Sequence, residues 1–473
     1  MRYLVTCSAL LLLLGGCATK EFPPSTSRSD IRSQQTLPTD ITYSDTPDAE
    51  PEQRPAPLED LLNYPQDAWA YADNIKPHAP DSTLQQNFEA RWFAPWNYTK
   101  PPQSLEAIRW PFESYRSDNA YGENLQPLPQ EWFDKMLENS NFDAYGSVNG
   151  YAISLRFSSL RNFPTNKPLF KNPSEAGEGF PFDYVQNSGV HANEPLFVSH
   201  YSRDGAWVYV FATHATGWLR SDEIAYIPTP HTQRWQEARQ VYVIKEGSVI
   251  KDSASHFLFR GRVGMMLPLI AEEDGDYRVL AVTAGPNGEG WYNEAHIARD
   301  AVSTTALQLD SWNLPRIANE MLSSLYGWGG LYEDRDCSST LRDLFAPFGI
   351  WLPRNSYQQS QVGKVISLEG MTPSEKIERI KAEGVPFETL LYRKGHIVLY
   401  LGTYDGDVVI LQNLWGVKTK IGEIPGRRIV GHTVISTLYL GAELPDYDEE
   451  NAFVTQLESM NVITLPAEDK GTL

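Results

Sequence analysis

The sequence predicts an α+β fold, in which two β-rich units precede a helix and a β-hairpin. Stretches near residues 204 and 274 repeat one order of features at a shift of about seventy residues: Asp-Gly, an alternating apolar strand, then Gly-Trp. Farther along, apolar residues recur from Leu341 to Phe348 with the spacing of a helix that buries one face. The runs HIVLYLG and VVILQN then read as the two strands of a hairpin.

Cys337 lies where this helix should begin, because Asp336 before it is a good N-cap. Unpaired N–H groups and the positive end of the helix dipole favour a thiolate in a first turn. The glycines at 327, 329 and 330 provide a backbone that can approach a ligand closely. We therefore treat Cys337 as a candidate nucleophile, although a lone cysteine is more often a small buried hydrophobe.

A nucleophilic thiol also needs a base, and His396 at the start of HIVLYLG is the candidate. The chain has 473 residues, nine histidines and a net charge of −20. No histidine pair has a metal-ligand spacing, so we expect no metal and no cofactor. The strong negative charge argues against nucleic acid and anionic membrane surfaces as partners.

Several motifs in order resemble the NlpC-type cell-wall cysteine peptidases: YGWGG, Asp-Cys-Ser, PRNS and Gly-His followed by LYLG, within about residues 310 to 440. The resemblance implies a papain-like core that cuts peptidoglycan stem peptides, with Cys337 as nucleophile and His396 as base. The two repeated β units resemble bacterial SH3-like barrels. The aromatic, Pro-interrupted segments before them resemble the N-terminal stabilising segment of some relatives.

The third catalytic position depends on the register of the hairpin. A three-residue loop from Thr403 to Asp405 puts Gln412 across from His396, whereas a two-residue turn at Asp405 and Gly406 puts Asn413 on that face. We prefer Gln412, with Asn413 as the alternative, since either amide oxygen can accept from the imidazole.

The resemblance also implies a polar cluster that receives the terminal ammonium of the stem peptide. The corresponding residues here are Tyr326, Asp336, Ser338 and Ser356. A buried ammonium needs such acceptors. The aromatic loop at residues 180–184 is interpreted first as a packed loop, with a role as one wall of the catalytic groove as the alternative.

The N-terminus resembles a bacterial lipoprotein signal: a short basic start, an apolar run from Leu10 to Leu14 and a Gly-Gly pair before Cys17. Cys17 would carry the lipid, and Ala18 after it resembles the outer-membrane sorting pattern. An ordinary secretory signal is the alternative. The prediction is a periplasmic protein that a lipid on Cys17 anchors to the outer membrane.

The predicted organisation has seven parts. They are a signal peptide (1–17), a disordered tether (18–55), a helical stabilising segment (56–145), two SH3-like barrels (146–229 and 230–306), an NlpC-type peptidase domain (307–442) and an acidic tail (443–473). The predicted function is hydrolysis of stem peptides at the γ-D-glutamyl–diaminopimelate bond, with a preference for a free N-terminal L-Ala. The alternatives are an inactive wall-binding scaffold and an amidase or acyltransferase on the same core. The sequence does not predict an oligomeric state.

Overall fold

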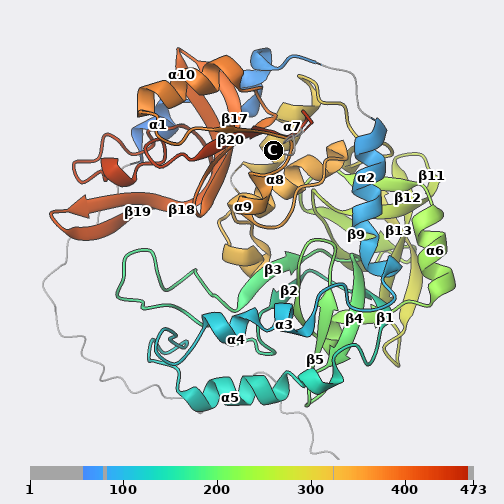
Figure 1. The fold of residues 1–473 in the computed structure, drawn as a ribbon. Helices are drawn as coiled ribbons and strands as arrows, with labels where there is room; N and C mark the ends of the chain where they lie inside the picture. The colour runs from blue at the N-terminus through green and yellow to red at the C-terminus, as the bar shows by residue number, and fades with distance from the viewer. Residues whose placement is uncertain (1–56, 78–81, 323, 467–473) are drawn as a thin grey trace, which may run out of the picture. The chain divides into compact units, whose positions relative to one another are not determined.

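The computed structural model describes residues 57–77, 82–322 and 324–466 (Figure 1). The predicted signal peptide, the lipidation site Cys17 and the tether at 18–55 lie outside the described residues. In the described part, no helix combines the length and the apolar character that crossing a membrane requires.

The two β-rich units have the same strand order, which shows the internal repeat at the level of topology. The first sheet runs β3-β2-β6-β5-β4-β1-β7 and the second runs β10-β9-β13-β12-β11-β8-β14, so each strand of the second sheet corresponds to the strand seven places earlier. The strands of the first are β1 (Gly150–Ser154), β2 (Ser158–Arg161), β3 (Gln186–Val190), β4 (Pro195–Tyr201), β5 (Trp207–Phe211), β6 (Thr216–Arg220) and β7 (Ile224–Tyr226). Those of the second are β8 (Gln240–Val243), β9 (Ser248–Asp252), β10 (Phe257–Gly261), β11 (Met266–Glu272), β12 (Asp276–Ala284), β13 (Gly290–Ala298) and β14 (Val302–Ser303).

The Asp-Gly and Gly-Trp signals occupy equivalent places in both sheets. Gly205 and Gly275 have positive φ angles of 71° and 95°, which suits the turns before β5 and β12. Trp218 pairs with Tyr209 across β5 and β6, and Trp291 pairs with Thr283 across β12 and β13. A helix, α6 (Thr229–Glu237), connects the two sheets.

The N-terminal segment consists of short helices, as its prolines predict. Its first part packs on the peptidase sheet: Asp60 accepts from the Thr437 backbone at 2.9 Å, and Gln66 exchanges hydrogen bonds with the Ile435 backbone at 2.7 and 2.9 Å. These contacts cover part of an edge strand. The helices are α1 (Glu59–Asn63), η1 (Ala68–Asn74), α2 (Ser82–Trp92), η2 (Ala94–Asn97), α3 (Leu105–Ile108), α4 (Trp110–Ser114) and α5 (Gln130–Asn139).

The peptidase part is a six-stranded sheet in the order β15-β20-β16-β17-β18-β19, with helices on both faces (Figure 1). The strands are β15 (Lys364–Ser367), β16 (Thr389–Arg393), β17 (His396–Tyr404), β18 (Asp407–Ile421), β19 (Ile424–Thr437) and β20 (Ser459–Val462). The helices are α7 (Asn313–Met321), α8 (Cys337–Phe345), α9 (Ser356–Gln359) and α10 (Pro373–Glu383).

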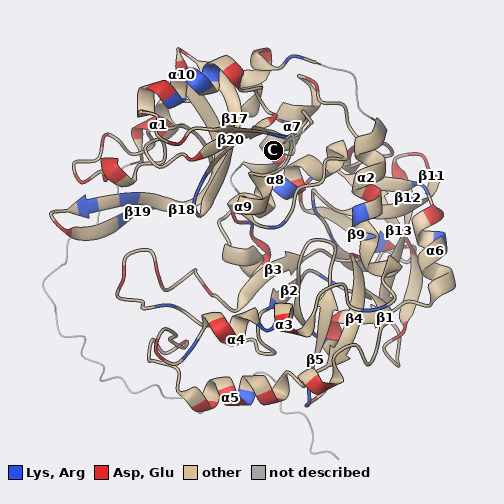
Figure 2. Ribbon diagram, in the orientation of Figure 1, with Lys and Arg blue, Asp and Glu red and all other residues tan. Residues whose placement is uncertain are grey.

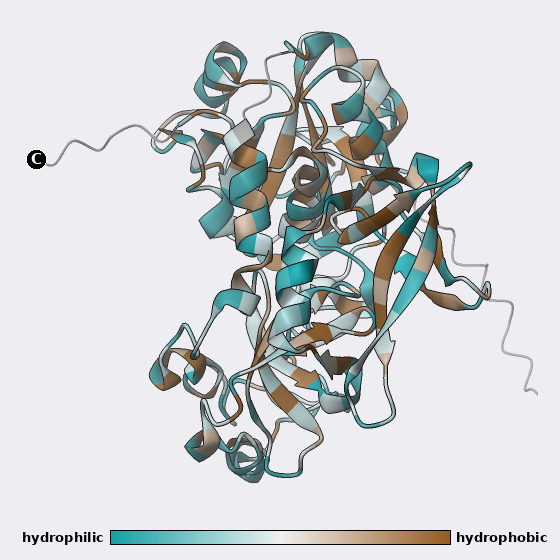
Figure 3. Cartoon of the chain, turned by 90° about the vertical axis from the view of Figure 1, so that its right-hand side faces the viewer, coloured by the Kyte–Doolittle hydropathy of each residue, from teal (hydrophilic) through white to brown (hydrophobic). Residues whose placement is uncertain are grey.

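The two faces of this sheet bury separate hydrophobic clusters. Ile397 and Leu399 of β17 pack with Leu344 of α8 on one face, whereas Val398 and Ile380 belong to the cluster on the other face. The alternation follows the two-residue period of a strand. Figure 3 shows hydrophobic residues gathered along the strands and hydrophilic ones on much of the outer helical surface.

The last part of the chain differs from the expected tail. Residues 459–462 form β20, which pairs with both β15 and β16 inside the peptidase sheet. The predicted acidic tail (443–473) therefore contributes a strand to the peptidase sheet, in which the apolar Met460 and Val462 are buried. A four-residue strand with only two such residues is too short to predict from its pattern.

Candidate active site

Cys337 is the first residue of α8, as its surroundings in the sequence predict. The Asp336 side chain caps the helix by accepting from the Ser339 backbone at 2.9 Å, and the Ser339 hydroxyl accepts from the Asp336 backbone at 2.9 Å. The partly buried Cys337 sulfur accepts a hydrogen bond from the Ile397 backbone. The thiol therefore lies beside the first residues of β17.

His396 is the first residue of β17 and contacts Gln412. Its Nε2 lies 3.0 Å from Gln412 Oε1, and the Gln412 amide donates to Ser436 Oγ at 2.8 Å. Because a carbonyl oxygen only accepts, this bond places the imidazole proton on Nε2. The Nδ1 atom keeps its lone pair and can act as a base. Phe453 packs against the imidazole with ring centroids 5.5 Å apart.

Gln412 is the neighbour of His396, as predicted, but the three-residue loop from Thr403 to Asp405 that we associated with it is absent from this hairpin. Tyr404 pairs with Asp407, so Asp405 and Gly406 form the two-residue turn that alone would favour Asn413. A β-bulge at Leu401 then shifts the pairing by one residue and restores Gln412 to the face of His396.

Asn413 lies on the opposite face and has a different role. Its side-chain amide donates to the Arg335 carbonyl at 2.8 Å and to Thr340 Oγ1 at 3.1 Å. It thereby ties β18 to the segment that carries α8.

The environment favours a neutral thiol and a neutral imidazole, which corrects the expectation of a thiolate. Burial, followed by the charge of Asp336, raises the pKa of Cys337 to about 12. Burial, followed by the charge of Arg393, lowers the pKa of His396 to about 4. The helix start is present, but desolvation outweighs its effect. The proton must therefore leave the thiol as the sulfur attacks.

Two cavities lie beside Cys337 and His396. The thiol cavity is lined by Cys337 and by the four predicted ammonium-binding residues. The imidazole cavity is lined by His396 and Gln412. Gly395 and Trp328 line both. The predicted ammonium-binding residues are Tyr326, Asp336, Ser338 and Ser356.

Asp336 does not offer a free negative charge to the thiol cavity. Arg354 Nη2 donates to Asp336 Oδ2 at 2.7 Å, and the Gly329 backbone donates to the same oxygen at 3.1 Å. Arg354 also donates to Ser338 Oγ at 2.9 Å. Both side chains are buried, so each charge is compensated by the other. A substrate ammonium would meet this ion pair rather than a bare carboxylate.

The first SH3-like unit forms part of the thiol cavity. Gln186 and Asn187 line it, and Gln186 Nε2 donates to the Gly329 carbonyl at 3.0 Å. A Cβ on Gly329 would lie 2.7 Å from the backbone oxygen of Gln186. A Cβ on Gly330 would lie 2.5 Å from the backbone nitrogen of Gly189. These glycines thus admit strand β3, whereas the sequence suggested that they admit a ligand.

The aromatic loop at 180–184 reaches the imidazole cavity, in agreement with the groove-wall interpretation. The Phe182 ring lies 5.3 Å from Trp328 and 6.3 Å from Tyr326, and it lines that cavity. Phe180 lies 6.1 Å from Trp415.

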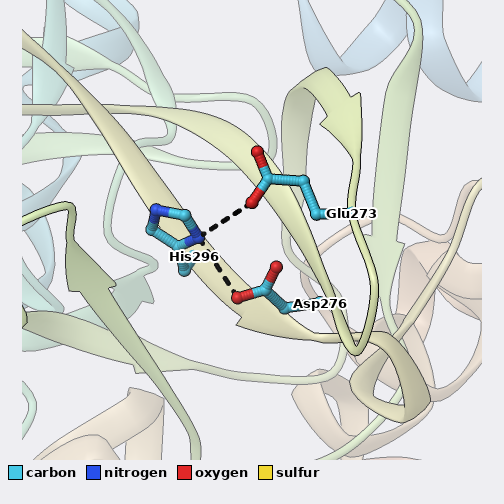
Figure 4. Close-up of side chains that lie close together, drawn as sticks. All are labelled: Glu273, Asp276 and His296. Carbon is cyan, nitrogen blue, oxygen red and sulfur yellow. Dashed lines mark hydrogen bonds and ion pairs between the residues drawn. The ribbon is translucent and has the colours of Figure 1, made fainter.

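One group of side chains in the described residues has the geometry of a cation site, and the sequence spacing did not reveal it. His296 Nδ1 lies 3.1 Å from Asp276 Oδ2 and 3.7 Å from Glu273 Oε2 in the second SH3-like sheet (Figure 4). Arg278 pairs with Glu273 at 3.3 Å and with Glu294 at 3.0 Å. Its positive charge competes with a cation for the same carboxylate.

A thiol at a helix start, an imidazole on the adjacent sheet and an amide that orients it define a papain-like cysteine hydrolase site. Comparison with known families agrees. The NlpC/P60 family matches residues 323–421, an SH3 domain of SH3b1 type matches 168–220, an SH3 domain of SH3b2 type matches 232–273, and the N-terminal NLPC_P60 stabilising domain matches 6–145. These findings support an NlpC-type peptidase domain preceded by two SH3-like domains.

Individual relatives are distant. The γ-D-glutamyl-L-lysine dipeptidyl-peptidase of Bacillus subtilis (strain 168) is 25% identical over 237 residues, which cover 47% of this chain and 72% of the relative. An NlpC/P60 endopeptidase structure from Photobacterium damselae subsp. piscicida has a TM-score of 0.74 at 23% identity, covering 85% of this chain and 98% of that one. An NlpC/P60 protein structure from Bacillus cereus ATCC 10987 has a TM-score of 0.44 at 16% identity, with coverages of 66% and 99%. The family and the curated relative together support a peptidoglycan hydrolase.

Proposed function

We propose that this protein hydrolyses peptidoglycan stem peptides at the γ-D-glutamyl–diaminopimelate bond. The observation that carries the proposal is the placement of the Cys337 thiol, hydrogen-bonded by the Ile397 backbone, next to the His396–Gln412 pair. The name of the Bacillus subtilis relative, a γ-D-glutamyl-L-lysine dipeptidyl-peptidase, supports cleavage after the γ-D-glutamyl residue, whereas the diaminopimelate on the other side of the bond rests on the family resemblance alone.

The reaction follows from the positions of the protons. His396 Nδ1 takes the thiol proton while Cys337 Sγ attacks the γ-carbonyl carbon. The protonated imidazole then gives this proton to the leaving amine as the C–N bond breaks, which leaves a thioester on Cys337. A water molecule, deprotonated by His396, hydrolyses the thioester. Gln412 accepts from Nε2–H throughout and keeps the ring in position.

We further propose a preference for peptides with a free N-terminal L-Ala. The first SH3-like unit narrows the thiol cavity through Gln186 and Asn187, which leaves room for a short acyl half. The neutral acceptors Tyr326, Ser338 and Ser356, together with the paired Asp336, would receive the ammonium.

Mass spectrometry of defined muropeptides after incubation with the purified full chain tests this function. We expect L-Ala-γ-D-Glu and a product that begins with diaminopimelate, and no cleavage by Cys337→Ala. Unaltered muropeptides with the wild-type protein, or cleavage by the Cys337→Ala variant, would overturn the proposal. Equal turnover of the same peptide with its amine acetylated or joined to muramic acid would refute the preference for a free terminus.

A further inference from the structure

The imidazole cavity contains three cationic side chains that the catalytic step does not use. Arg393 ends β16, Lys418 lies on β18 and Arg427 lies on β19, and all three line the cavity next to His396. Figure 2 shows Lys and Arg on both strands of the long β18–β19 ribbon, in a chain where acidic residues predominate.

The positions of these three cations cost free energy in the protein without a bound ligand. Lys418 and Arg427 are direct cross-strand partners, and like charges in that position repel. The Nε atoms of Arg393 and Arg427 are buried and have no hydrogen-bond partner. Among the described residues, no ion pair within 4.0 Å involves any of the three.

The acidic groups near them are held by other donors. Asp448, the acid that acts on Lys418, accepts from the Asn451 side chain at 2.9 Å. Glu178, near Arg427, accepts from Tyr184 Oη at 2.8 Å. Glu458, near Arg393, accepts from the Lys394 backbone at 3.1 Å. None of these acids lines the cavity, whereas Arg393, Lys418 and Arg427 all do, so an incoming anion meets a cationic lining.

The position of the cavity identifies which half of the substrate enters it. The acyl carbon must contact Cys337, which lines the thiol cavity, whereas the leaving amine must reach His396, which lines the imidazole cavity. The leaving half of the peptide therefore occupies the cationic cavity.

We propose that Arg393, Lys418 and Arg427 bind the carboxylates of the leaving amino acid and so select diaminopimelate over lysine. This inference rests on the proposed function. The end of the diaminopimelate side chain carries a carboxylate beside its ammonium, whereas the lysine side chain ends in an ammonium alone. A guanidinium forms paired, charge-assisted hydrogen bonds with a carboxylate, and the three cations repel a lone ammonium.

The test compares kcat/KM for L-Ala-γ-D-Glu-meso-diaminopimelate and L-Ala-γ-D-Glu-L-Lys. We expect the wild-type chain to favour the first by about tenfold or more, as one charge-assisted hydrogen bond provides. Arg393→Gln and Arg427→Gln should each reduce this ratio about tenfold, mainly through slower cleavage of the diaminopimelate peptide. Arg427→Lys, which keeps the charge, should restore much of the preference.

Lys420→Gln is the matched control. Lys420 lies on β18, as Lys418 does, but it pairs with Glu423 at 3.4 Å and does not line the imidazole cavity. Its ratio should equal that of the wild type. Wild-type cleavage of both peptides with the ratio unchanged in Arg393→Gln and Arg427→Gln would overturn the inference and leave the proposed function intact. Failure of the wild type to cleave either peptide would overturn the function itself.

A third peptide, in which the α-carboxylate of D-Glu is amidated, tests whether the cations bind the acyl half or the leaving half of the substrate. A variant that changes selectivity against this amide, but leaves the diaminopimelate-to-lysine ratio unchanged, would show that the cations bind the acyl half, which contradicts the assignment.

Discussion

Gln412 and Asn413 are adjacent on β18, yet their replacement by alanine should affect different properties. The Gln412 carbonyl accepts from His396 at 3.0 Å, so Gln412→Ala removes one hydrogen bond that orients the base. A net contribution of ~0.5–1.5 kcal/mol for such a bond, at about 1.4 kcal/mol per tenfold, corresponds to a fall in kcat/KM of about two- to tenfold. The loss is much smaller than that expected for removing His396, since general base catalysis is worth ~10²–10⁴ in rate.

Asn413→Ala should reduce stability instead. Asn413 is 1% exposed, and its removal takes away its bonds to the Arg335 carbonyl and to Thr340 Oγ1, although the Gly327 backbone still donates to that carbonyl at 2.9 Å. The loss of such a hydrogen bond costs ~0.5–1.5 kcal/mol of unfolding free energy. The activity per folded molecule should change little.

The assay pairs kcat/KM on a defined stem peptide with urea denaturation of each variant. Gln412→His is the matched control, because a second imidazole can still accept from His396, and its activity should stay near that of the wild type. A large loss of activity in Asn413→Ala at unchanged stability, with Gln412→Ala unaffected, would refute the register and the bulge at Leu401 on which it depends.

The remaining predictions concern chemistry, pH, the fold and the anchor. Cys337→Ala should abolish peptide hydrolysis without lowering the melting temperature. In the wild type, Cys337 should react slowly with iodoacetamide at pH 7, because its pKa is raised to about 12; rapid alkylation would contradict this. Because the pKa of His396 is lowered to about 4, its base form persists on acidification, so kcat/KM should fall little between pH 7 and 5.5; a midpoint near the ordinary value of ~6.5 would refute the neutral environment. Arg335→Ala should lower the free energy of unfolding in urea by ~1.5–3 kcal/mol, because the buried Asp343 loses the bond from Arg335 Nε at 2.7 Å while Arg342 still pairs with it at 2.7 Å; an unchanged free energy of unfolding would contradict this. Cys17→Ser should move the protein from the membrane fraction to the soluble fraction, and unchanged fractionation would rule out the lipid anchor.

The residues that a local pattern determines could be predicted from the sequence. Cys337 follows an N-cap and precedes a helical apolar repeat, and both signals lie within about ten residues of it. The repeat of the two SH3-like units was visible because Asp-Gly turns and Gly-Trp pairs recur in one order. Gln412 was the preferred partner of His396, but for a reason that the structure corrects. One extra residue at Leu401 decides the register, and no residue type marks such a bulge with certainty.

Features that depend on distant segments could not be predicted in this way. The Asp336–Arg354 ion pair joins two motifs that the sequence shows separately, so the sequence did not reveal that the charge of Asp336 is compensated. Phe453 contacts His396 from a segment that looked like a tail. Pairing across strands also decides whether Lys418 and Arg427 face one another, and that again depends on register.

The distribution of charge explains why the cations must lie inside the site. The chain carries a net charge of −20, and a stem peptide, the proposed substrate, carries several carboxylates, so the field of the whole protein does not attract it. At physiological ionic strength that field is screened beyond roughly 8 Å, whereas charges within a partly buried cavity are screened much less. Arg393, Lys418 and Arg427 therefore act on the substrate only after it has entered the imidazole cavity. In the thiol cavity the Asp336–Arg354 pair is already neutralised, so the two halves of the peptide meet different electrostatic surroundings. If the proposed function holds, this difference in charge favours one direction of binding across Cys337.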